Sequence, residues 1–348
     1  MTLTNEQLKS MPKIELHLHL DGSVLPQTLI ELAAEQGKEL PTTAIEELSS
    51  LMRAPETCLD LNDYLRTFDV VLPYLQTAEA LERVAYEVVD QCASDHVRYV
   101  EVRFAPQLHR LGGLSIDDVY EAVIRGMNRG EKQFGVIVRC IGICLRGHSE
   151  EQNMEVVEAA QAYLHKGLVA VDLAGAEALY PPELYAPVFV RAQQLGIPIT
   201  IHAGEAGGAQ NIETSVLKLG ATRIGHGVRL QEDSHLLQQM VERGIPLEFC
   251  PISNLQTKAV TAWELYPIVD YMNKGIKVTV NTDNLTVSHT SLTKELLTLQ
   301  QQCGLTTEDI VQLQRNAVES IFLEQPAREE FIQTYDAALE QWIKKLDM

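Results

Sequence analysis

The chain has 348 residues, a length that fits roughly two average domains or one large single-domain α/β barrel. Apolar residues make up 45% of it and charged residues 22%, so disorder, a collagen-like repeat and a membrane-spanning protein are all poor fits. The 48 acidic residues outnumber the 28 basic ones, which gives a formal net charge of -20. A surface this negative repels phosphate backbones and anionic lipid headgroups, so we expect neither nucleic acid nor a membrane as a partner.

In chain order, eight short apolar, β-branched runs predict β-strands. A helical pattern separates each run from the next, and a glycine such as Gly196 often ends the helix. The predicted strands are KIELHLHL from Lys13, VRYVEVRFAP from Val97, VIVRCIGICL from Val136, LVAVDLAG from Leu168, IPITIHAGE from Ile197, ATRIGHG from Ala221, IPLEFCP from Ile245 and KVTVNTD from Lys277. Near-continuous apolar strands that alternate with helices are typical of parallel strands buried on both faces.

This alternation predicts an α/β fold, a (β/α)₈ TIM barrel in a single domain over residues 1–348. The stretch between the first two strands is too long for one crossover, so we expect a helical insertion at about 41–95. The segment at about 306–348 is expected to add one or two helices outside the barrel. A doubly wound open sheet is the structural alternative, but no glycine-rich phosphate loop follows the first strand.

Cysteine usage and the first residues bear on the compartment. The six cysteines lie mostly within apolar runs and form no CxxC pair, which favours buried, reduced thiols over a disulfide framework or a zinc finger. The segment MTLTNEQLKSMPKIE lacks the basic and apolar regions of a secretion signal. No apolar run approaches the length of a membrane span. We therefore expect a cytoplasmic protein.

The chemistry is expected at the carboxyl ends of the strands, because barrel enzymes build their sites at that rim. His17 and His19 end the first strand two residues apart, so their side chains point to the same face. His202 lies near the end of the fifth strand and Asp283 near the end of the eighth. One strand-end histidine alone is more often structural, but three imidazoles and a carboxylate on one rim predict a zinc-type site that leaves a position for water. Six other histidines are expected to be solvated or capping residues: His96, His109, His148, His165, His235 and His289.

Six motifs in the chain are MPKIELHLHLDGS, LAGAE, HAGE, IGHGVRL, CPISNLQT and VNTDN. As a set they resemble the adenosine deaminase family of metal-dependent amidohydrolase barrels, and RNAVESIF near the end resembles the family's C-terminal helix. The resemblance therefore covers nearly the whole chain. Related binuclear barrels use a lysine at the end of strand four, and VAVDLAGAE offers none. The resemblance implies one Zn²⁺ per subunit, bound by His17, His19, His202 and Asp283.

The resemblance also implies the reaction, which is hydrolytic deamination of adenosine, and of 2′-deoxyadenosine, to inosine and ammonia in purine salvage. Attack on the purine carbon that bears the amino group requires a proton at ring nitrogen N1, and Glu205 matches the family's proton donor. Such a donor needs a raised pKa and a dry site. His226 matches the residue that orients or deprotonates the attacking water and stabilises charge on its oxygen. Asp283 is expected to act both as a ligand and as an acceptor for that water.

Substrate binding is implied for His19, Asp21, Gly175 and Asn284. Asp21 resembles the residue that binds the ribose 5′-hydroxyl, with His19 nearby, and its carboxylate disfavours a 5′-phosphate. Related adenine deaminases tend to have Glu at this place, so Asp21 also favours a nucleoside over a free base. Gly175 resembles the glycine whose N–H meets purine N3, although Ala176 replaces the family's frequent Asp. Asn284 stands where many members carry a second Asp, and we predict that its amide donates to N7.

Two other interpretations stay open. The first is another hydrolase on the same barrel, acting on adenine, a modified adenine nucleoside or a cyclic amide. The second is a barrel that binds a partner without catalysis, which predicts a broken ligand set, whereas the four ligands and Glu205 are all present. The sequence leaves the oligomeric state open, and the helical insertion is the expected lid.

Overall fold

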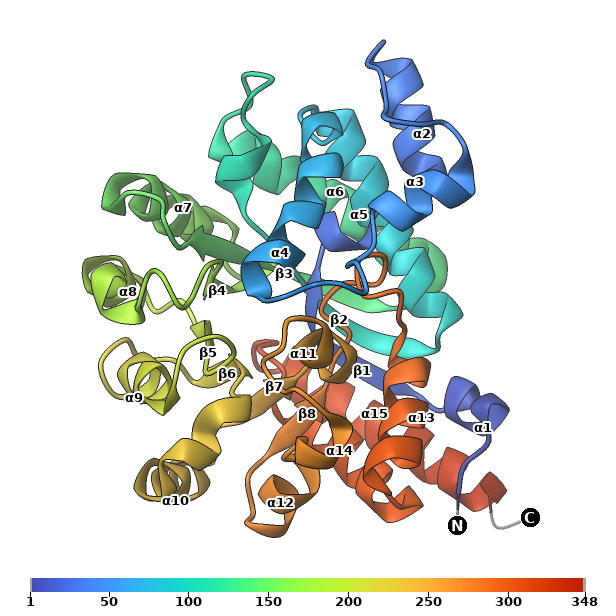
Figure 1. The fold of residues 1–348 in the computed structure, drawn as a ribbon, viewed down its shortest axis with the longest axis vertical. Coiled ribbons are helices and arrows are strands. Elements are labelled where there is room, and N and C mark those ends of the chain that lie inside the picture. The colour runs from blue at the N-terminus through green and yellow to red at the C-terminus, as the bar shows by residue number, and fades with distance from the viewer. Residues whose placement is uncertain (1, 347–348) are drawn as a thin grey trace.

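Eight parallel strands form a closed barrel at the centre of the computed structural model, which describes residues 2–346 (Figure 1). The strands are β1 (Lys13–His19), β2 (Val97–Phe104), β3 (Ile137–Leu145), β4 (Leu168–Ala174), β5 (Thr200–Ala203), β6 (Arg223–His226), β7 (Leu247–Phe249) and β8 (Val278–Val280). They pair as two four-stranded sheets, β1 to β4 and β5 to β8. Isolated parallel bridges join Leu18 to Asp283 and Val171 to Ile199, so the two sheets meet at both edges. The predicted (β/α)₈ barrel is confirmed.

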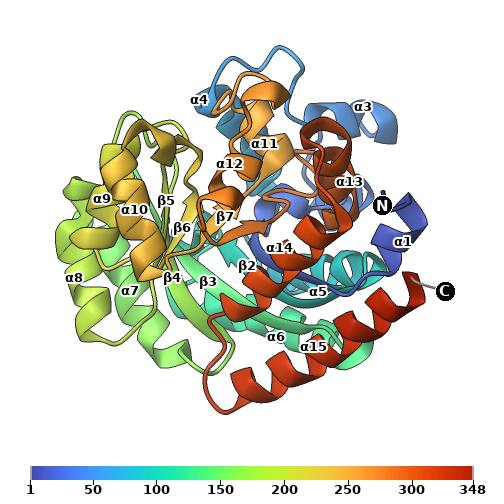
Figure 2. The ribbon, with the colours of Figure 1, turned by 90° about the horizontal axis from the view of Figure 1, so that it is seen from below.

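Helices alternate with the strands and cover the barrel from outside (Figure 2). These are α5 (Ala78–Ser94), α6 (Ile116–Phe134), α7 (Glu150–Tyr163), α8 (Ala186–Gln194), α9 (Ala209–Leu217), α10 (Ser234–Arg243), α12 (Ile268–Asn273) and α14 (Thr307–Glu319). Local sequence explains their limits. Helix α6, for example, begins at a capping box of Ser115 and Asp118 and ends at Gly135, whose φ of 71° is a left-handed conformation that glycine adopts readily.

Between β1 and α5 the chain forms several short helices. They are α2 (Pro26–Glu35), α3 (Ile45–Leu51), α4 (Leu61–Leu65), and the 3₁₀ helices η1 (Asp21–Ser23), η2 (Arg66–Val70) and η3 (Leu72–Tyr74). Of the residues expected as an insertion, 78–94 form α5, the crossover helix that packs beside β2 and α6. Helix α4 lies on the same side of the barrel as α11 (Pro251–Gln256), which follows β7 (Figure 2). The short helices thus stand at the carboxyl ends of the strands, above the site described below.

Three further helices complete the described chain, α1 (Asn5–Ser10), α13 (Leu292–Cys303) and α15 (Ala327–Leu346). The expected C-terminal helices are therefore α14 and α15. Helix α15 returns to the N-terminal segment: the Tyr335 hydroxyl donates to the carbonyl of Pro12 at 2.9 Å, and Trp342 Nε1 donates to the carbonyl of Gln7 at 3.1 Å. Within residues 2–346, no helix is both long enough and apolar enough to cross a membrane.

Charged side chains lie inside the barrel. Arg103 of β2 donates to Asp172 of β4 at 2.9 Å and to Glu248 of β7 at 2.8 Å. Arg223 of β6 donates to Glu248 and to Glu101 of β2, both at 2.6 Å. All five of these charged side chains are buried. Each occupies a single inward-facing position in an otherwise apolar strand, so the strand patterns in the sequence do not predict them. The barrel therefore carries an ion-pair network directly beneath its carboxyl end.

Candidate metal centre and substrate pocket

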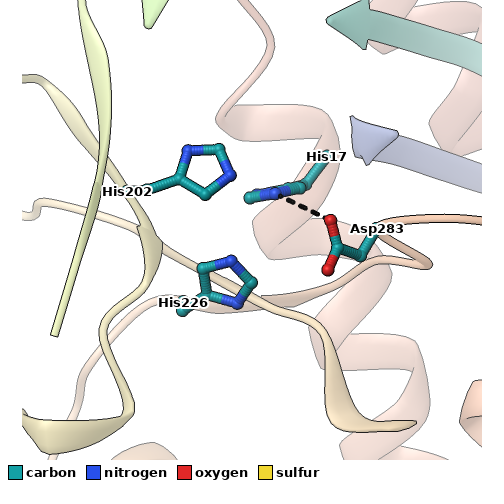
Figure 3. A group of neighbouring side chains, drawn as sticks. All are labelled: His17, His202, His226 and Asp283. Atoms are coloured by element: carbon teal, nitrogen blue, oxygen red, sulfur yellow. Dashed lines mark ion pairs between the residues drawn. The ribbon is translucent and has the colours of Figure 1, made fainter. Parts of the chain in front are cut away.

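Buried imidazole and carboxylate groups converge at the carboxyl end of the barrel. The possible ligand atoms of His17, His202, His226 and Asp283 all lie within 4.8 Å of one another (Figure 3). His19 lies beside this group, since its Nε2 is 3.2 Å from His202 Nε2 and 3.2 Å from Asp283 Oδ1. The structure thus brings all four sequence-predicted ligands together, from β1, β5 and the turn after β8.

The ring nitrogens of this group are arranged for a cation. His17 Nε2 is buried without a hydrogen-bond partner, 3.5 Å from Asp283 Oδ1. Nδ1 of His17 is paired with Glu248 at 2.8 Å. Nδ1 of His202 is paired with Asp172 at 2.9 Å. Because a carboxylate accepts the Nδ1 proton, the Nε2 lone pair of each ring faces the centre. Facing lone pairs repel unless a cation lies between them, so the donor set fits a metal ion.

The charge balance of the surroundings agrees with a divalent ion. Ion pairs link His17, His19 and His202 to one buried network of two guanidinium groups and four carboxylates, those of Arg103, Arg223, Glu101, Asp172, Glu248 and Asp283. An excess of two negative charges away from water is costly unless a cation balances it. A divalent ion at the histidines supplies that balance.

His226 is held differently from the other imidazoles. Its Nδ1 accepts a hydrogen bond from the Asn254 amide nitrogen at 2.9 Å, and the Tyr266 hydroxyl donates to the amide oxygen at 3.0 Å. Burial lowers the pKa of His226 well below its ordinary value, so the ring is neutral and carries its proton on Nε2, 3.6 Å from Glu205. His226 and Asp283 have φ angles of 61° and 62°, a left-handed conformation that clusters at functional sites in residues other than glycine. His226 is thus arranged as a hydrogen-bond donor toward the site.

Glu205 lies on the loop after β5, buried next to the metal-ligand group. Burial, and then the charges of Asp283 and Glu177, raise the pKa of Glu205 well above its usual value, which favours the protonated carboxyl. The loop is held by Glu177, whose carboxylate accepts hydrogen bonds of 2.7–3.0 Å from four successive backbone N–H groups, those of Gly204, Glu205, Ala206 and Gly207. Sequence reasoning missed this function of Glu177. The signal that could have found it is an acidic residue three positions after the end of the fourth strand.

A pocket of about 310 Å³ opens over these groups. Its polar lining includes every residue predicted to bind the substrate and the predicted proton donor, namely His19, Asp21, Gly175, Asn284 and Glu205. Its apolar lining includes residues from the short helices before α5, among them Leu61, Leu65, Phe68 and Leu72. A larger cavity, of about 600 Å³, lies between α1, α5 and the loop before α13 and contains none of the clustered histidines. The chemistry therefore belongs to the smaller pocket.

Asp21 is buried in this pocket, and its Oδ1 has no hydrogen-bond partner. The expectation of a solvated or capping role is wrong for His109, which is fully buried after β2. His109 Nδ1 donates to the carbonyl of Leu75 at 2.9 Å, while its Nε2 has no partner. Burial raises the pKa of Asp21, and the neighbouring His109 offsets only part of that effect. His148, also expected to be solvated or capping, lines the same pocket. Two of the six remaining histidines thus belong to the surroundings of the site.

A closed (β/α)₈ barrel with imidazoles and a carboxylate gathered at its carboxyl end is the architecture of a barrel enzyme with a candidate metal site. The family model described as adenosine deaminase matches residues 12–338. Curated relatives include the adenosine deaminase of Shewanella woodyi, 41% identical over 93% of this chain and 98% of the relative. That of Enterococcus faecalis is 42% identical over 97% of this chain and 99% of the relative. The chain therefore belongs to the adenosine deaminase family, and it is a deaminating hydrolase.

Solved structures that resemble the chain come from the same kind of enzyme. An adenine deaminase from Arthrobacter aurescens is 28% identical with a TM-score of 0.86, covering 96% of this chain and 99% of its own. The N6-methyl-AMP deaminase from Arabidopsis thaliana is 26% identical with a TM-score of 0.84, covering 97% and 100%. These relatives act on different adenine compounds by their names, so the substrate of this chain has to be argued from its own pocket.

Proposed function

We propose that the chain hydrolyses adenosine, and 2′-deoxyadenosine, to inosine and ammonia, using one Zn²⁺ per subunit. The observation that carries the proposal is the buried Glu205 carboxyl, whose pKa is raised and which lies 3.6 Å from His226 Nε2, next to the histidines whose Nε2 atoms face one centre. This combination provides a proton donor and a metal site within one pocket of purine size. The product is a purine nucleoside, so the activity belongs to purine salvage.

His17, His19, His202 and Asp283 are the proposed zinc ligands. Three imidazoles and one carboxylate suit zinc and leave a position for water. When bound, the ion lowers the pKa of a water molecule so that hydroxide is available near neutral pH. The Ser253 hydroxyl donates to Asp283 Oδ2 at 2.5 Å, while Oδ1 faces the histidines. One oxygen of Asp283 is thus oriented by the protein and the other is directed at the centre.

Glu205 is the proposed proton donor to N1. Addition of water to the amino-bearing ring carbon breaks the aromatic system, so N1 must receive a proton as the tetrahedral carbon forms. The buried Glu205 carboxyl holds that proton, and Glu177 keeps its loop in place through the backbone. The insertion side chains Leu61 and Phe68 line the pocket and exclude water from this proton.

His226 is proposed to orient the attacking water and to stabilise the charge that develops on its oxygen. The Asn254 contact at Nδ1 leaves the Nε2 proton to be donated, which favours stabilisation of oxygen over removal of a proton. The hydroxyl on the tetrahedral carbon then gives its proton to the amino group as the C–N bond breaks, so ammonia leaves and the purine carbonyl remains. The other proton of the attacking water restores the Glu205 carboxyl.

The nucleoside is proposed to bind through three contacts. Asp21, with its unpartnered Oδ1, accepts a hydrogen bond from the ribose 5′-hydroxyl, with His19 nearby. A carboxylate at this place repels a 5′-phosphate, which favours adenosine over AMP. The backbone N–H of Gly175 meets N3, and the amide of Asn284 donates to the unprotonated N7. Ala176, which replaces the family's frequent Asp, leaves no carboxyl group at its own position in the pocket lining. Glu177 is still present and holds the loop that carries Glu205.

The test is an absorbance assay for loss of the adenine chromophore, combined with a measurement of ammonia. Adenosine, adenine, AMP and N6-methyl-AMP are offered in parallel to the zinc-loaded chain. The proposal expects loss of the chromophore for adenosine at a rate far above that for the other three, with ammonia released from adenosine; N6-methyl-AMP would release methylamine, so the absorbance reading decides its rate. Preferred turnover of adenine or of a nucleotide would instead assign one of the alternative substrates. The cytoplasmic location stays a prediction.

A further inference from the structure

A tyrosine from the short helices over the pocket contacts the residue proposed to face N7. Tyr64 of α4 is buried, and its hydroxyl accepts a hydrogen bond from Asn284 Nδ2 at 2.9 Å. The same hydroxyl is hydrogen-bonded to Ser288 Oγ at 2.7 Å. Asn284 and Ser288 belong to the loop after β8, which also carries Asp283. The short helices over the pocket, here called the covering segment, therefore contact the loop after β8, which forms the floor of the site.

The amide of Asn284 has three polar positions, two N–H bonds and one oxygen, and the protein restrains two of them. One N–H is donated to Tyr64. The oxygen Oδ1 has no hydrogen-bond partner and lies against Gly22, where an added Cβ would come within 1.7 Å of it. The second N–H is thus the polar position left for a ligand, and Asn284 lines the pocket.

Apolar packing holds Tyr64 in this position. Tyr64 forms a small buried cluster with Cys58 and Val287, and Phe68 packs against it. The backbone N–H of Ala54 also donates to the carbonyl of Val287 at 2.9 Å, three residues beyond Asn284. Because these contacts do not involve the phenol oxygen, replacement of Tyr64 by Phe keeps the packing and removes only the hydrogen bonds.

We propose that Tyr64 is a positioning residue that sets the direction of the Asn284 amide, so that the free N–H meets N7 of the purine. The inference rests on the proposed function, and it gives the covering segment a part in recognising the base in addition to excluding water. An amide without the Tyr64 contact can turn its oxygen toward N7, and an acceptor that faces an acceptor loses the hydrogen bond.

The experiment compares kcat and KM for adenosine with those for the analogue that has carbon and hydrogen at position 7. Four variants are measured on the zinc-loaded chain: Tyr64→Phe, Asn284→Ala, the double variant, and the control Tyr74→Phe. Tyr74 lies in the same covering segment, and its hydroxyl donates to the carbonyl of Glu39, away from the pocket lining. The control therefore loses a comparable hydrogen bond outside the site.

For Tyr64→Phe the inference predicts a loss of about five- to tenfold in kcat/KM for adenosine, the size of one hydrogen bond, and no loss for the 7-carbon analogue. Asn284→Ala should show the same selective loss, and the double variant should lose no more than Asn284→Ala alone. Tyr74→Phe should leave the ratio of the two substrates unchanged.

Equal losses for both substrates in Tyr64→Phe, or losses that multiply in the double variant, would overturn the inference. If Asn284→Ala abolishes the preference for adenosine while Tyr64→Phe retains it, Asn284 reads N7 without help from Tyr64, and only the inference fails. If the unchanged chain turns over both substrates equally well, the proposed contact to N7 fails, and the inference fails with it.

Discussion

The interaction between Asp172 and His202 offers a direct test of how the protein prepares the metal site. Asp172 accepts hydrogen bonds from His202 Nδ1 and from Arg103 Nη1, each at 2.9 Å. Both partners are donors here, so each requires a carboxylate oxygen at this position. Both of these contacts are at Oδ2, and Oδ1 lies 3.1 Å from His202 Nδ1. In Asp172→Asn the charged guanidinium retains the one remaining oxygen, so the amide nitrogen takes the Oδ1 position. The amide N–H₂ then faces Nδ1 of His202, which forces the ring proton onto Nε2 and removes the lone pair that faces the centre.

The expected cost of Asp172→Asn is about 10- to 100-fold in metal affinity, or about 1.4–2.7 kcal/mol. Competition between the folded protein and a chelator of known zinc affinity measures it without relying on catalysis. Asp270→Asn is a matched control, because Asp270 forms an exposed ion pair with Lys274 on α12 and its loss should leave zinc affinity unchanged. Equal zinc affinity in Asp172→Asn and in the unchanged chain would refute the idea that this carboxylate orients His202.

Three further outcomes are expected. Glu177→Gln should shift the alkaline limb of the pH profile of kcat to lower pH. Loss of the nearby negative charge lowers the pKa of Glu205, and an ionised Glu205 cannot donate its proton. An alkaline limb at the same pH in the variant would argue against this coupling. Burial raises the pKa of Glu295 from 4.5 to about 8, so between these pH values the folded chain holds a proton that the unfolded chain releases. The free energy of unfolding should therefore fall, by up to about 5 kcal/mol, as pH rises from 4.5 to 8. Denaturant unfolding of Glu295→Gln should lack this slope, and a slope equal to that of the unchanged chain would contradict the assignment. Chelation of the metal should abolish turnover and lower the melting temperature, both restored by zinc, whereas full activity at zero metal content would exclude a metal role.

The barrel and most of the pocket could be predicted from local patterns. The spacing of His17 and His19 places both on one face of a strand, and strand ends meet at one rim in a barrel, so convergence with His202 and Asp283 follows from topology. Each of these residues carries its own signal in the sequence, because it closes an apolar run.

The groups that orient the site could not be predicted in the same way. Glu248 lies 231 residues from His17, its partner at Nδ1, and Tyr64 lies 220 residues from Asn284. Such pairs are set by how the loops and strands pack, and no periodicity in one segment reports on a partner in another. His109 was misjudged for a related reason, since a histidine after a strand has the same local pattern whether it is solvated or buried.

The central claim is that a protonated carboxyl acts beside a metal site that forms independently of it. Zinc content and adenosine turnover of Glu205→Gln, measured on the same sample, test this most directly, with Glu213→Gln on α9, outside the pocket lining, as the matched control. The account predicts that Glu205→Gln retains one zinc ion per chain while kcat falls by about 10²- to 10⁴-fold, and that the control keeps both. Turnover by Glu205→Gln equal to that of the unchanged chain, at equal zinc content, would contradict it.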